Sequence, residues 1–178
     1  MTKKDSKSSK KLKLVNCLME NSIQSISKIA EKTNMYRRTV WQKKKELEDD
    51  HTIWGYTTVI DESKLDLILY VAIFKIKPIS SKKFPDLVIH KLTTEIPSKL
   101  GVRLIDVLFT TGTYTCILKF SSQNQKSAKG YFETLRVVFN DYFLDDPLLL
   151  EVDFPLVQCG KLNPELHKIY DLVPKTTS

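Results

Sequence analysis

A short run of basic, amide and aromatic side chains stands out in the first quarter of the sequence. Guanidinium and amide groups hydrogen-bond to the edges of guanine and adenine, and lysine ammonium groups pair with phosphates. The run is therefore typical of a surface that contacts double-stranded DNA. We expect the contacts to come from Tyr36, Arg37, Arg38, Thr39, Trp41, Gln42, Lys43 and Lys45.

These side chains are expected to have different roles. Arg37 and Arg38 are placed to reach guanine edges or phosphates. Gln42 suits adenine through its amide, although an exposed helix glutamine without a partner explains it nearly as well. Lys43 and Lys45 are expected to contact phosphates, which set position and affinity without reading the sequence.

Three aromatic side chains each have more than one possible role. Trp41 either packs against a thymine methyl group or the sugar-phosphate wall, or covers a gap created by Lys44. Trp54 and Tyr56 lie further along the chain and are expected to belong to the core of a hinge rather than to contact DNA.

The elements that must position these residues have the spacing of a helix-turn-helix over residues 25–56. Asn34 stands where the chain has to turn sharply, and asparagine tolerates a left-handed backbone. Either Ser22 or Ser25 is expected to cap the first helix. The two helices are expected to pack through Ile26, Ile29, Ala30, Val40 and Leu47.

Two flanking elements complete this unit. A preceding helix that ends near Asn21 is expected to face inward through Leu12, Val15, Leu18 and Met19. After the second helix of the helix-turn-helix, a short wing hairpin strand and a connecting strand are expected, with Gly55 between them. They are built on Ile53, Trp54, Tyr56, Thr58 and Ile60. The resulting class is a winged helix-turn-helix, whose second helix enters the DNA major groove.

The distribution of charge supports contact with nucleic acid. Residues 1–50 hold 13 Lys and Arg against 7 Asp and Glu, a net charge of +6 out of the chain's total of +7. Each basic side chain beside a phosphate releases counterions, so a basic segment joined to a nearly neutral one favours phosphate binding. A solvated surface with a loose basic tail is the plain alternative.

Other functional classes find little support. No apolar run approaches the roughly 20 residues of a membrane span, and the polar, lysine-rich start is no secretory signal, so a cytoplasmic protein without a membrane partner is expected. Catalytic motifs are absent, and the three histidines lie far apart, so we expect no enzyme and no metal site. The three cysteines, in no CxxC pair, are expected to be reduced and mostly buried: Cys17, Cys116 and Cys159.

The second half of the chain has a different pattern. Strands are expected at 68–77, 102–112, 113–121 and 148–157, and helices at 82–96 and 128–143. This βαββαβ order predicts a ferredoxin-like antiparallel sandwich with both helices on one face of the sheet, and hence an α+β protein. The opposite face is expected to be covered by a second copy because it is too apolar for water, with Val71, Ile73, Ile117, Leu149 and Val157 among charged residues.

The expected organisation of the chain has five parts. A disordered basic arm over residues 1–11 precedes the winged helix-turn-helix of residues 12–55. A hinge strand and linker over 56–66 leads to an oligomerisation and effector domain over 67–160. Residues 161–178 form a C-terminal tail.

Two runs make the chain resemble the Lrp/AsnC (leucine-responsive, "feast/famine") transcriptional regulators across residues 12–160. They are KIAEKTNMYRRTVWQKKKELEDDHTIWGYTTVID (28–61) and TTGTYTCILKF (110–120). The resemblance implies dimers that assemble through their sheets, often into tetramers or octamers, and DNA that is bent or wrapped. It also implies small effectors, usually amino acids, bound between dimers beside the turn of the second run.

This sequence departs from the family pattern at four positions. Tyr36 replaces the usual capping Ser, Lys44 an apolar residue, His51 a Gly, and Thr115 an acidic residue. A hydroxyl cannot replace a carboxylate that holds an ammonium group, so an amino-acid effector is in doubt. A plain tight turn is favoured over an effector cleft for Thr111, Gly112, Thr113, Tyr114 and Thr115.

Two functions follow from these observations. The first is a sequence-specific transcriptional regulator, which Arg37, Arg38 and Gln42 favour. The second is an architectural nucleoid or chromatin protein with weak sequence preference and no effector, which Thr115 and the lysine-rich arm favour. Either would be associated with the nucleoid.

Overall fold

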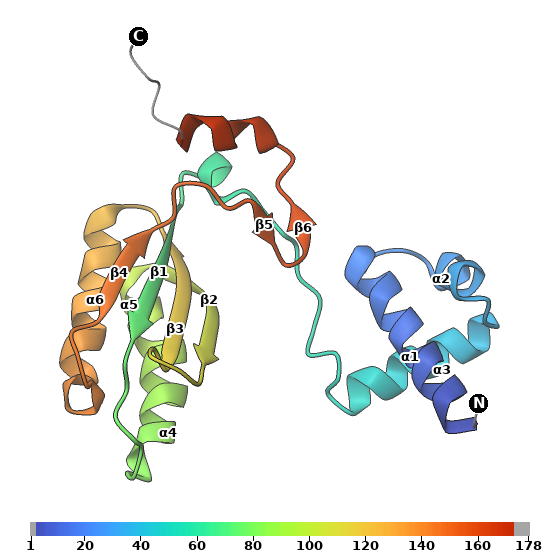
Figure 1. Ribbon diagram of the computed structural model, residues 1–178, viewed down its shortest axis with the longest axis horizontal. Helices are drawn as coiled ribbons and strands as arrows, with labels where there is room; N and C mark the ends of the chain where they lie inside the picture. Colours follow the sequence, from blue (N-terminus) through green and yellow to red (C-terminus); the bar gives the residue numbers. More distant parts are fainter. Residues whose placement is uncertain (1–2, 173–178) are drawn as a thin grey trace. The chain divides into compact units, whose positions relative to one another are not determined.

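The computed structural model describes residues 3–172, and the side chains of residues 9–172. The chain forms two compact units. The first comprises Met1–Val59 with Cys159–Lys161, and the second Ile60–Gln158 with Leu162–Ser178. The second unit therefore begins inside the segment expected to be a hinge. Figure 1 follows both units along the chain.

The first unit is built from three helices: α1 (Lys3–Glu20), α2 (Ile26–Thr33) and α3 (Arg37–Asp49). Apolar residues three, four or seven positions apart on each helix give each one a single inward face. Six side chains, each at most 6% exposed, form the core: Leu14, Leu18, Ile29, Ala30, Val40 and Leu47.

The start of the chain corrects two predictions. The helix α1 begins at Lys3, so residues 3–11 are not the disordered arm that their composition suggested, while residues 1–2 lie outside the described part. Lysine and serine permit a helix that is anchored further along by Leu14 and Leu18. The inward face is also rotated from the expected one, because Leu12 is 62% and Met19 68% exposed.

The turn between α2 and α3 has the expected form. Ser25, rather than Ser22, caps α2 by accepting a hydrogen bond from the Lys28 backbone N–H. Asn34 ends α2 in the left-handed conformation, at φ 51° and ψ 49°. This geometry reverses the chain within a few residues, so that α3 can cross α2 with Val40 buried.

The prediction of a hairpin in the wing was wrong. Residues 51–60 contain no strand. Ile53 packs against the core of the first unit, and its N–H bonds to the Leu47 carbonyl. The segment is therefore held to the end of α3 by Ile53 and by this hydrogen bond. It contains no pair of hydrogen-bonded strands.

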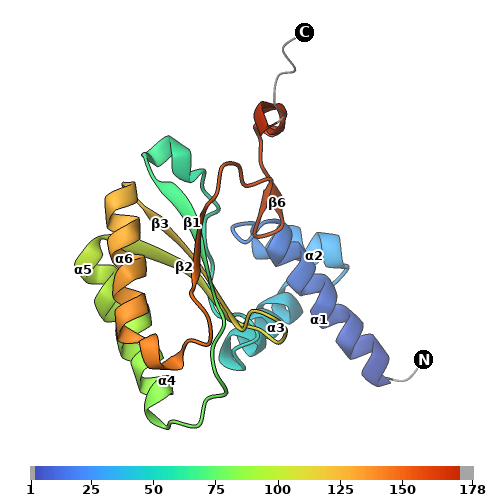
Figure 2. The same ribbon diagram turned by 60° about the vertical axis from the view of Figure 1, so that its left-hand side comes forward.

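The second unit is the expected ferredoxin-like sandwich. Its four strands, β1 (Ile68–Phe74), β2 (Val102–Phe109), β3 (Cys116–Ser122) and β4 (Leu148–Glu151), form a sheet in the order β2-β3-β1-β4, with every pair antiparallel. One continuous helical stretch is made of α4 (Lys83–Leu87), η2 (Val88–Glu95) and α5 (Ile96–Leu100), and a second helix is α6 (Gln125–Val138). Figure 2 shows α4, α5 and α6 along one side of the sheet.

The helix expected at 82–96 is longer and less regular. Its middle part, η2, is a π-helix, and the helix continues through Pro97 to Leu100. Pro97 has no N–H to donate, and it lies in the first turn of α5, where proline is tolerated. Gly101 then ends the helix in the left-handed conformation.

The remaining elements lie outside the four-stranded sheet. They are η1 (Glu62–Leu65), η3 (Asn140–Tyr142), β5 (Val157–Gln158), β6 (Lys161–Leu162) and η4 (Leu166–Leu172). The strand expected at 148–157 therefore ends at Glu151. The expected C-terminal tail contains β6 and η4, and its last six residues, 173–178, lie outside the described part.

The core of the second unit lies between the sheet and its helices. Alternate residues of β3 point into it, as expected, and α6 covers them. Phe120 stacks on Tyr70 at a centroid distance of 5.5 Å and meets the ring of Tyr131 edge-on at 4.8 Å. Aromatic pairs of this geometry add to the stability gained from buried area.

A polar network joins the linker and the C-terminal segment to the sheet. Glu62 is 5% exposed and accepts hydrogen bonds from Arg103 at 2.9 Å and from Gln158 at 3.1 Å. The Gln158 side-chain oxygen in turn accepts a bond from Lys119 at 2.8 Å. A buried carboxylate needs such partners, and here they fasten η1 and β5 to strands β2 and β3.

Candidate nucleic-acid interface

The recognition helix α3 buries two apolar residues on one face and exposes polar residues on the opposite face. Val40 and Leu47 are at most 2% exposed, whereas Arg38, Gln42 and Lys45 are exposed. These three are four and three residues apart, so they lie on one helix face. Of the other expected contacts, Tyr36, Arg37 and Trp41 are exposed and Thr39 and Lys43 are partly buried.

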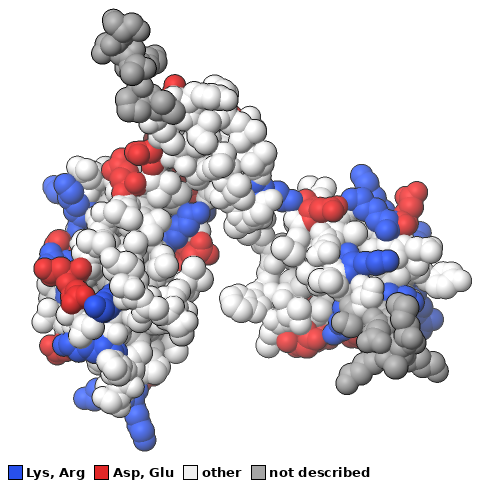
Figure 3. Space-filling view, viewed as in Figure 1, with Lys and Arg blue, Asp and Glu red and all other residues white. Residues whose placement is uncertain are grey.

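The N-terminal end of α3 is open. Tyr36 occupies the N-cap position without a side-chain hydrogen bond to the helix, and its ring is 87% exposed. The first turn contains no acidic residue. Figure 3 shows Lys and Arg side chains spread over the face of the first unit that is in view. The end of α3 that carries Arg37 and Arg38 thus has the polarity that attracts a phosphate.

Trp41 is 55% exposed and takes part in a cation–π contact with Lys45, whose ammonium lies 5.7 Å from the ring centroid. It does not cover Lys44, whose ammonium lies instead over the ring of Tyr56 at 4.9 Å. The cover that the second interpretation gave to Lys44 is thus supplied by Tyr56, and a contact of Trp41 with DNA stays a prediction.

Lys44, Glu48 and Tyr56 form a cluster that the sequence did not reveal. Glu48 lies 3.2 Å from the Lys44 ammonium, and its Oε1 accepts a hydrogen bond of 2.8 Å from the Tyr56 hydroxyl. Lys44 and Glu48 are four residues apart on α3, a spacing that could have indicated the ion pair. The contact with Tyr56 depends on the path of the segment after α3.

The cluster shifts the pKa values of its members. The Tyr56 hydrogen bond and then Lys44 lower the pKa of Glu48. Partial burial opposes the charge on Lys44, but hydrogen bonding with Glu48 and Tyr56 outweighs it and raises the pKa of Lys44. The stabilisation from Glu48 is therefore complete above its ordinary pKa and is lost as the pH falls through the lowered value.

Trp54 contradicts the expectation that it belongs to a hinge core. Its side chain is 95% exposed, and Tyr56 is 46% exposed. The chain is held one residue before it and two residues after it, because Ile53 packs in the core and Tyr56 bonds to Glu48. Trp54 is thus presented to solvent by a segment fixed at two points.

The residues considered for an effector form a hydrogen-bonded turn between β2 and β3. The Thr110 N–H bonds to the Thr115 carbonyl at 3.0 Å, and the Thr110 hydroxyl to the Tyr114 carbonyl at 2.6 Å. The Thr115 hydroxyl accepts the Ile76 N–H at 2.7 Å, which extends the pairing of β1 with β3. Thr111, Gly112, Thr113 and Tyr114 are exposed around this turn, with Gly112 at a positive φ of 136°.

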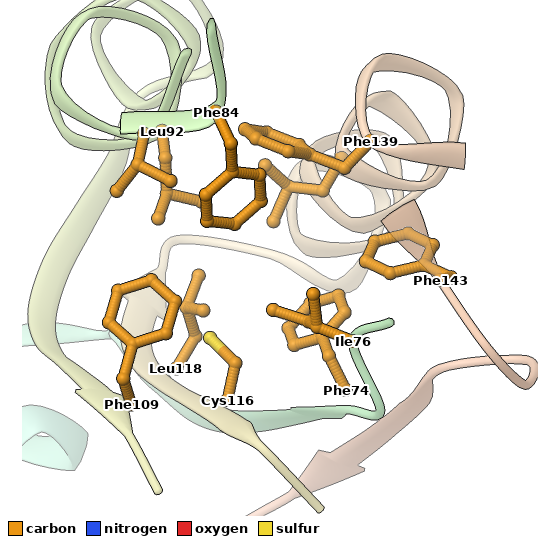
Figure 4. A pocket seen from close by; sticks show the side chains of 11 residues that line it. Phe74, Ile76, Phe84, Leu92, Phe109, Cys116, Leu118, Phe139 and Phe143 are labelled. Atoms are coloured by element: carbon orange, nitrogen blue, oxygen red, sulfur yellow. The ribbon is translucent and has the colours of Figure 1, made fainter. Parts of the chain in front are cut away.

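A small apolar pocket lies between some helix and sheet side chains of the second unit. Figure 4 shows it between Phe84, Leu92 and Phe139 on the helix side and Phe109 and Cys116 on the sheet side. The empty space is about 320 Å³, counted out to its open side. The Cys116 sulfur is the only heteroatom among its lining side chains, and burial raises the pKa of that thiol to about 11. The space thus offers no group for a charged effector.

The face of the sheet away from the helices is largely apolar; we call it the outer face. Cross-strand pairing places Leu108, Ile117, Ile73 and Leu148 in one row across all four strands. Two expected members are wrong: Leu149 packs against the core, and Val157 lies in β5, outside this sheet. Leu148, at 44% exposed, and Leu150, at 47%, take their place.

Within residues 3–172, no helix is long and apolar enough to cross a membrane. The same residues contain no group of three or more His, Cys, Asp and Glu side chains that could hold a metal ion. Cys17 is partly buried, Cys116 buried and Cys159 exposed, and all three are free, so burial is less general than the sequence suggested.

The fold and the exposed polar face of α3 define an α+β protein with a helix-turn-helix unit followed by a ferredoxin-like unit. Residues 7–53 match the family model described as winged helix-turn-helix DNA-binding. No curated protein matches the chain significantly.

Solved structures with the same two-unit fold include regulators of the Lrp/AsnC type. LrpC of B. subtilis has a TM-score of 0.59 at 15% identity, over 83% of this chain and 95% of that one. An AsnC family transcriptional regulator from Agrobacterium tumefaciens has a TM-score of 0.60 at 14% identity, over 86% and 95%. The protein PH0061 has a TM-score of 0.66 at 17% identity, over 82% and 92%. The resemblance inferred from the sequence is thus confirmed in the fold.

Proposed function

We propose that this protein is a sequence-specific, DNA-binding transcriptional regulator that acts as a homodimer. The observation that carries the proposal is the exposed face of α3, where Arg38, Gln42 and Lys45 are in line opposite the buried Val40 and Leu47. A guanidinium and an amide on one helix face are the groups that read guanine and adenine in the major groove.

The remaining contacts divide by role. Arg37 and the open end of α3 bind a phosphate, and Tyr36 and Thr39 lie beside that end. Lys43 and Lys45 add phosphate contacts that do not depend on base sequence. Trp41 packs against a thymine methyl group or the sugar-phosphate wall. These assignments rest on exposure and on position along the helix.

The homodimer forms through the outer face. Apolar side chains exposed across four strands favour burial against an identical surface, because a two-fold axis makes one patch complementary to itself. A dimer also carries two recognition helices, which suit two half-sites about 34–36 Å apart or a multiple of that distance. A protein with this role works in the cytoplasm, at the nucleoid.

The turn between β2 and β3 supports a regulator that does not hold an amino acid in the manner the resemblance implies. The hydroxyl of Thr115 is already bonded to the Ile76 N–H and offers no negative charge to an ammonium group. The groups around the exposed turn, Thr111, Gly112, Thr113 and Tyr114, are therefore structural in our proposal.

Binding to DNA from upstream of the protein's own gene and to a random duplex, followed by fluorescence anisotropy across a salt series, tests this function. A preference of about a thousandfold or more for the upstream DNA supports a sequence-specific regulator. Equal and steeply salt-dependent binding would support instead the architectural role, which Thr115 and the lysine-rich start of the chain favour. Absence of binding at low salt would contradict both.

Two substitutions separate base reading from phosphate contact. Arg38→Ala is expected to weaken binding to the preferred DNA by roughly 1–3 kcal/mol with little change on random DNA. Lys45→Ala is expected to weaken binding to both and to reduce the salt slope by about one. Equal losses on both duplexes for Arg38→Ala would contradict its role in base reading.

A further inference from the structure

Five basic residues lie on the recognition helix, but Lys44 is not used like the others. Its side chain is 27% exposed, and its ammonium is engaged by the Glu48 carboxylate at 3.2 Å and by the face of the Tyr56 ring at 4.9 Å. On a helix with 100° between residues, Lys44 lies nearer to the buried Val40 than to the exposed Arg38. Its positive charge is therefore paired with a carboxylate of the same helix.

Glu48 connects the two elements. Its Oε1 pairs with Lys44 on α3 and accepts the hydroxyl of Tyr56, eight residues further along and beyond the end of the helix. Tyr56 meets Lys44 with its ring and Glu48 with its hydroxyl, so a single side chain from the segment is held at two places. Charge-assisted hydrogen bonds and cation–π contacts of this kind are directional.

The segment between α3 and Tyr56 has few other attachments. Ile53 packs in the core, and its N–H bonds to the Leu47 carbonyl at 2.9 Å. Trp54, Thr57 and Thr58 are exposed, and no strand pairing orders them. The contacts of Tyr56 therefore fix the course of the chain where a wing hairpin would otherwise have to do so.

We propose that Lys44, Glu48 and Tyr56 form a clamp that fixes the segment after α3 beside the recognition helix, as positioning residues for DNA recognition rather than as DNA contacts. This inference rests on the proposed function. The clamp replaces strand pairing in the wing, and it sets the direction in which Trp54 is presented. It also removes Lys44 from the set of basic residues that bind phosphate.

The test compares the full-length protein with Lys44→Met, Glu48→Gln and Tyr56→Phe, each close in size to the original side chain. Lys45→Met is the matched control, because Lys45 is the exposed neighbour of Lys44 on the same helix. Affinity for the preferred and the random duplex is measured across a salt series, and circular dichroism verifies that each variant is folded.

The three clamp variants are expected to lower the ratio of preferred to random affinity roughly tenfold, as when a base contact is misaligned. Lys44→Met is expected to leave the salt slope unchanged, while Lys45→Met reduces it by about 0.9 and keeps the ratio. Lys44→Met combined with Tyr56→Phe is expected to cost little more than either alone, since both break one clamp.

Two results would overturn the clamp. A salt slope reduced by about one in Lys44→Met would make Lys44 a phosphate contact. An unchanged affinity ratio in all three variants would show that the clamp has no part in recognition. Failure of the wild-type protein to bind either duplex would instead contradict the proposed function, and with it any positioning role in DNA recognition.

Discussion

Replacing Leu148 by aspartate is expected to convert the proposed dimer into a folded monomer and to weaken binding to a two-half-site DNA by about 100-fold or more, because the second recognition helix is no longer tethered to the first. Leu148 ends the apolar row on the outer face, beside Ile73, and is 44% exposed. A carboxylate there would be buried against the second copy without a partner.

The control for this experiment is Val137→Asp. Val137 is 77% exposed on α6, the helix that covers the opposite side of the sheet, so the same change of chemistry is made away from the proposed interface. Sedimentation velocity gives the oligomeric state of both variants. A Leu148→Asp protein that remains dimeric would place the dimer interface elsewhere.

Leu47→Ala is expected to destabilise the first unit by about 2–5 kcal/mol, since a buried leucine leaves both lost apolar contact and a cavity. Leu47 is 2% exposed within a core of only six buried side chains. A unit of this size has a total stability of similar magnitude, so a large fraction of the variant should be unfolded and DNA binding should fall with it.

Trp41 and Trp54 are already 55% and 95% exposed, so their fluorescence would change little on unfolding, and amide hydrogen exchange of α2 and α3 follows the first unit separately from the second instead. Urea titration of Leu47→Ala is compared with Leu12→Ala, since Leu12 is 62% exposed and its loss should change stability by less than about 0.5 kcal/mol. Similar unfolding midpoints for the two variants would show that the helix core is not organised around Leu47.

The parts of the fold that were predicted correctly are those set by local periodicity. The alternation of Cys116, Leu118 and Phe120 in β3 and the helical spacing of Phe132 and Leu135 in α6 each leave one inward face. The left-handed Asn34 followed from the chemistry of its side chain. These patterns depend on neighbours a few residues apart, which the sequence displays directly.

The errors arose where local pattern is ambiguous or where distant residues decide. The run of leucines at 148–150 is apolar on both faces, so its phase was set by pairing with β1 and Leu149 turned inward. The lysine- and serine-rich composition of residues 3–11 suggested disorder, although they form the start of α1. Tyr56 was assigned to a hinge core because its bond to Glu48 could not be foreseen. That bond depends on the turn of the chain at His51, which local sequence does not show.

His51 itself has a consequence for how the recognition helix moves. It follows the C-cap of α3 in the left-handed conformation, at φ 56°, where the resemblance suggests a glycine. A glycine would be free to visit both signs of φ and so serve as a swivel. A residue with a β carbon has fewer ways to bend, and it loses less conformational entropy on folding. The chain therefore has a fixed corner in place of a swivel, and α3 is expected to meet DNA already joined rigidly to the segment that follows it.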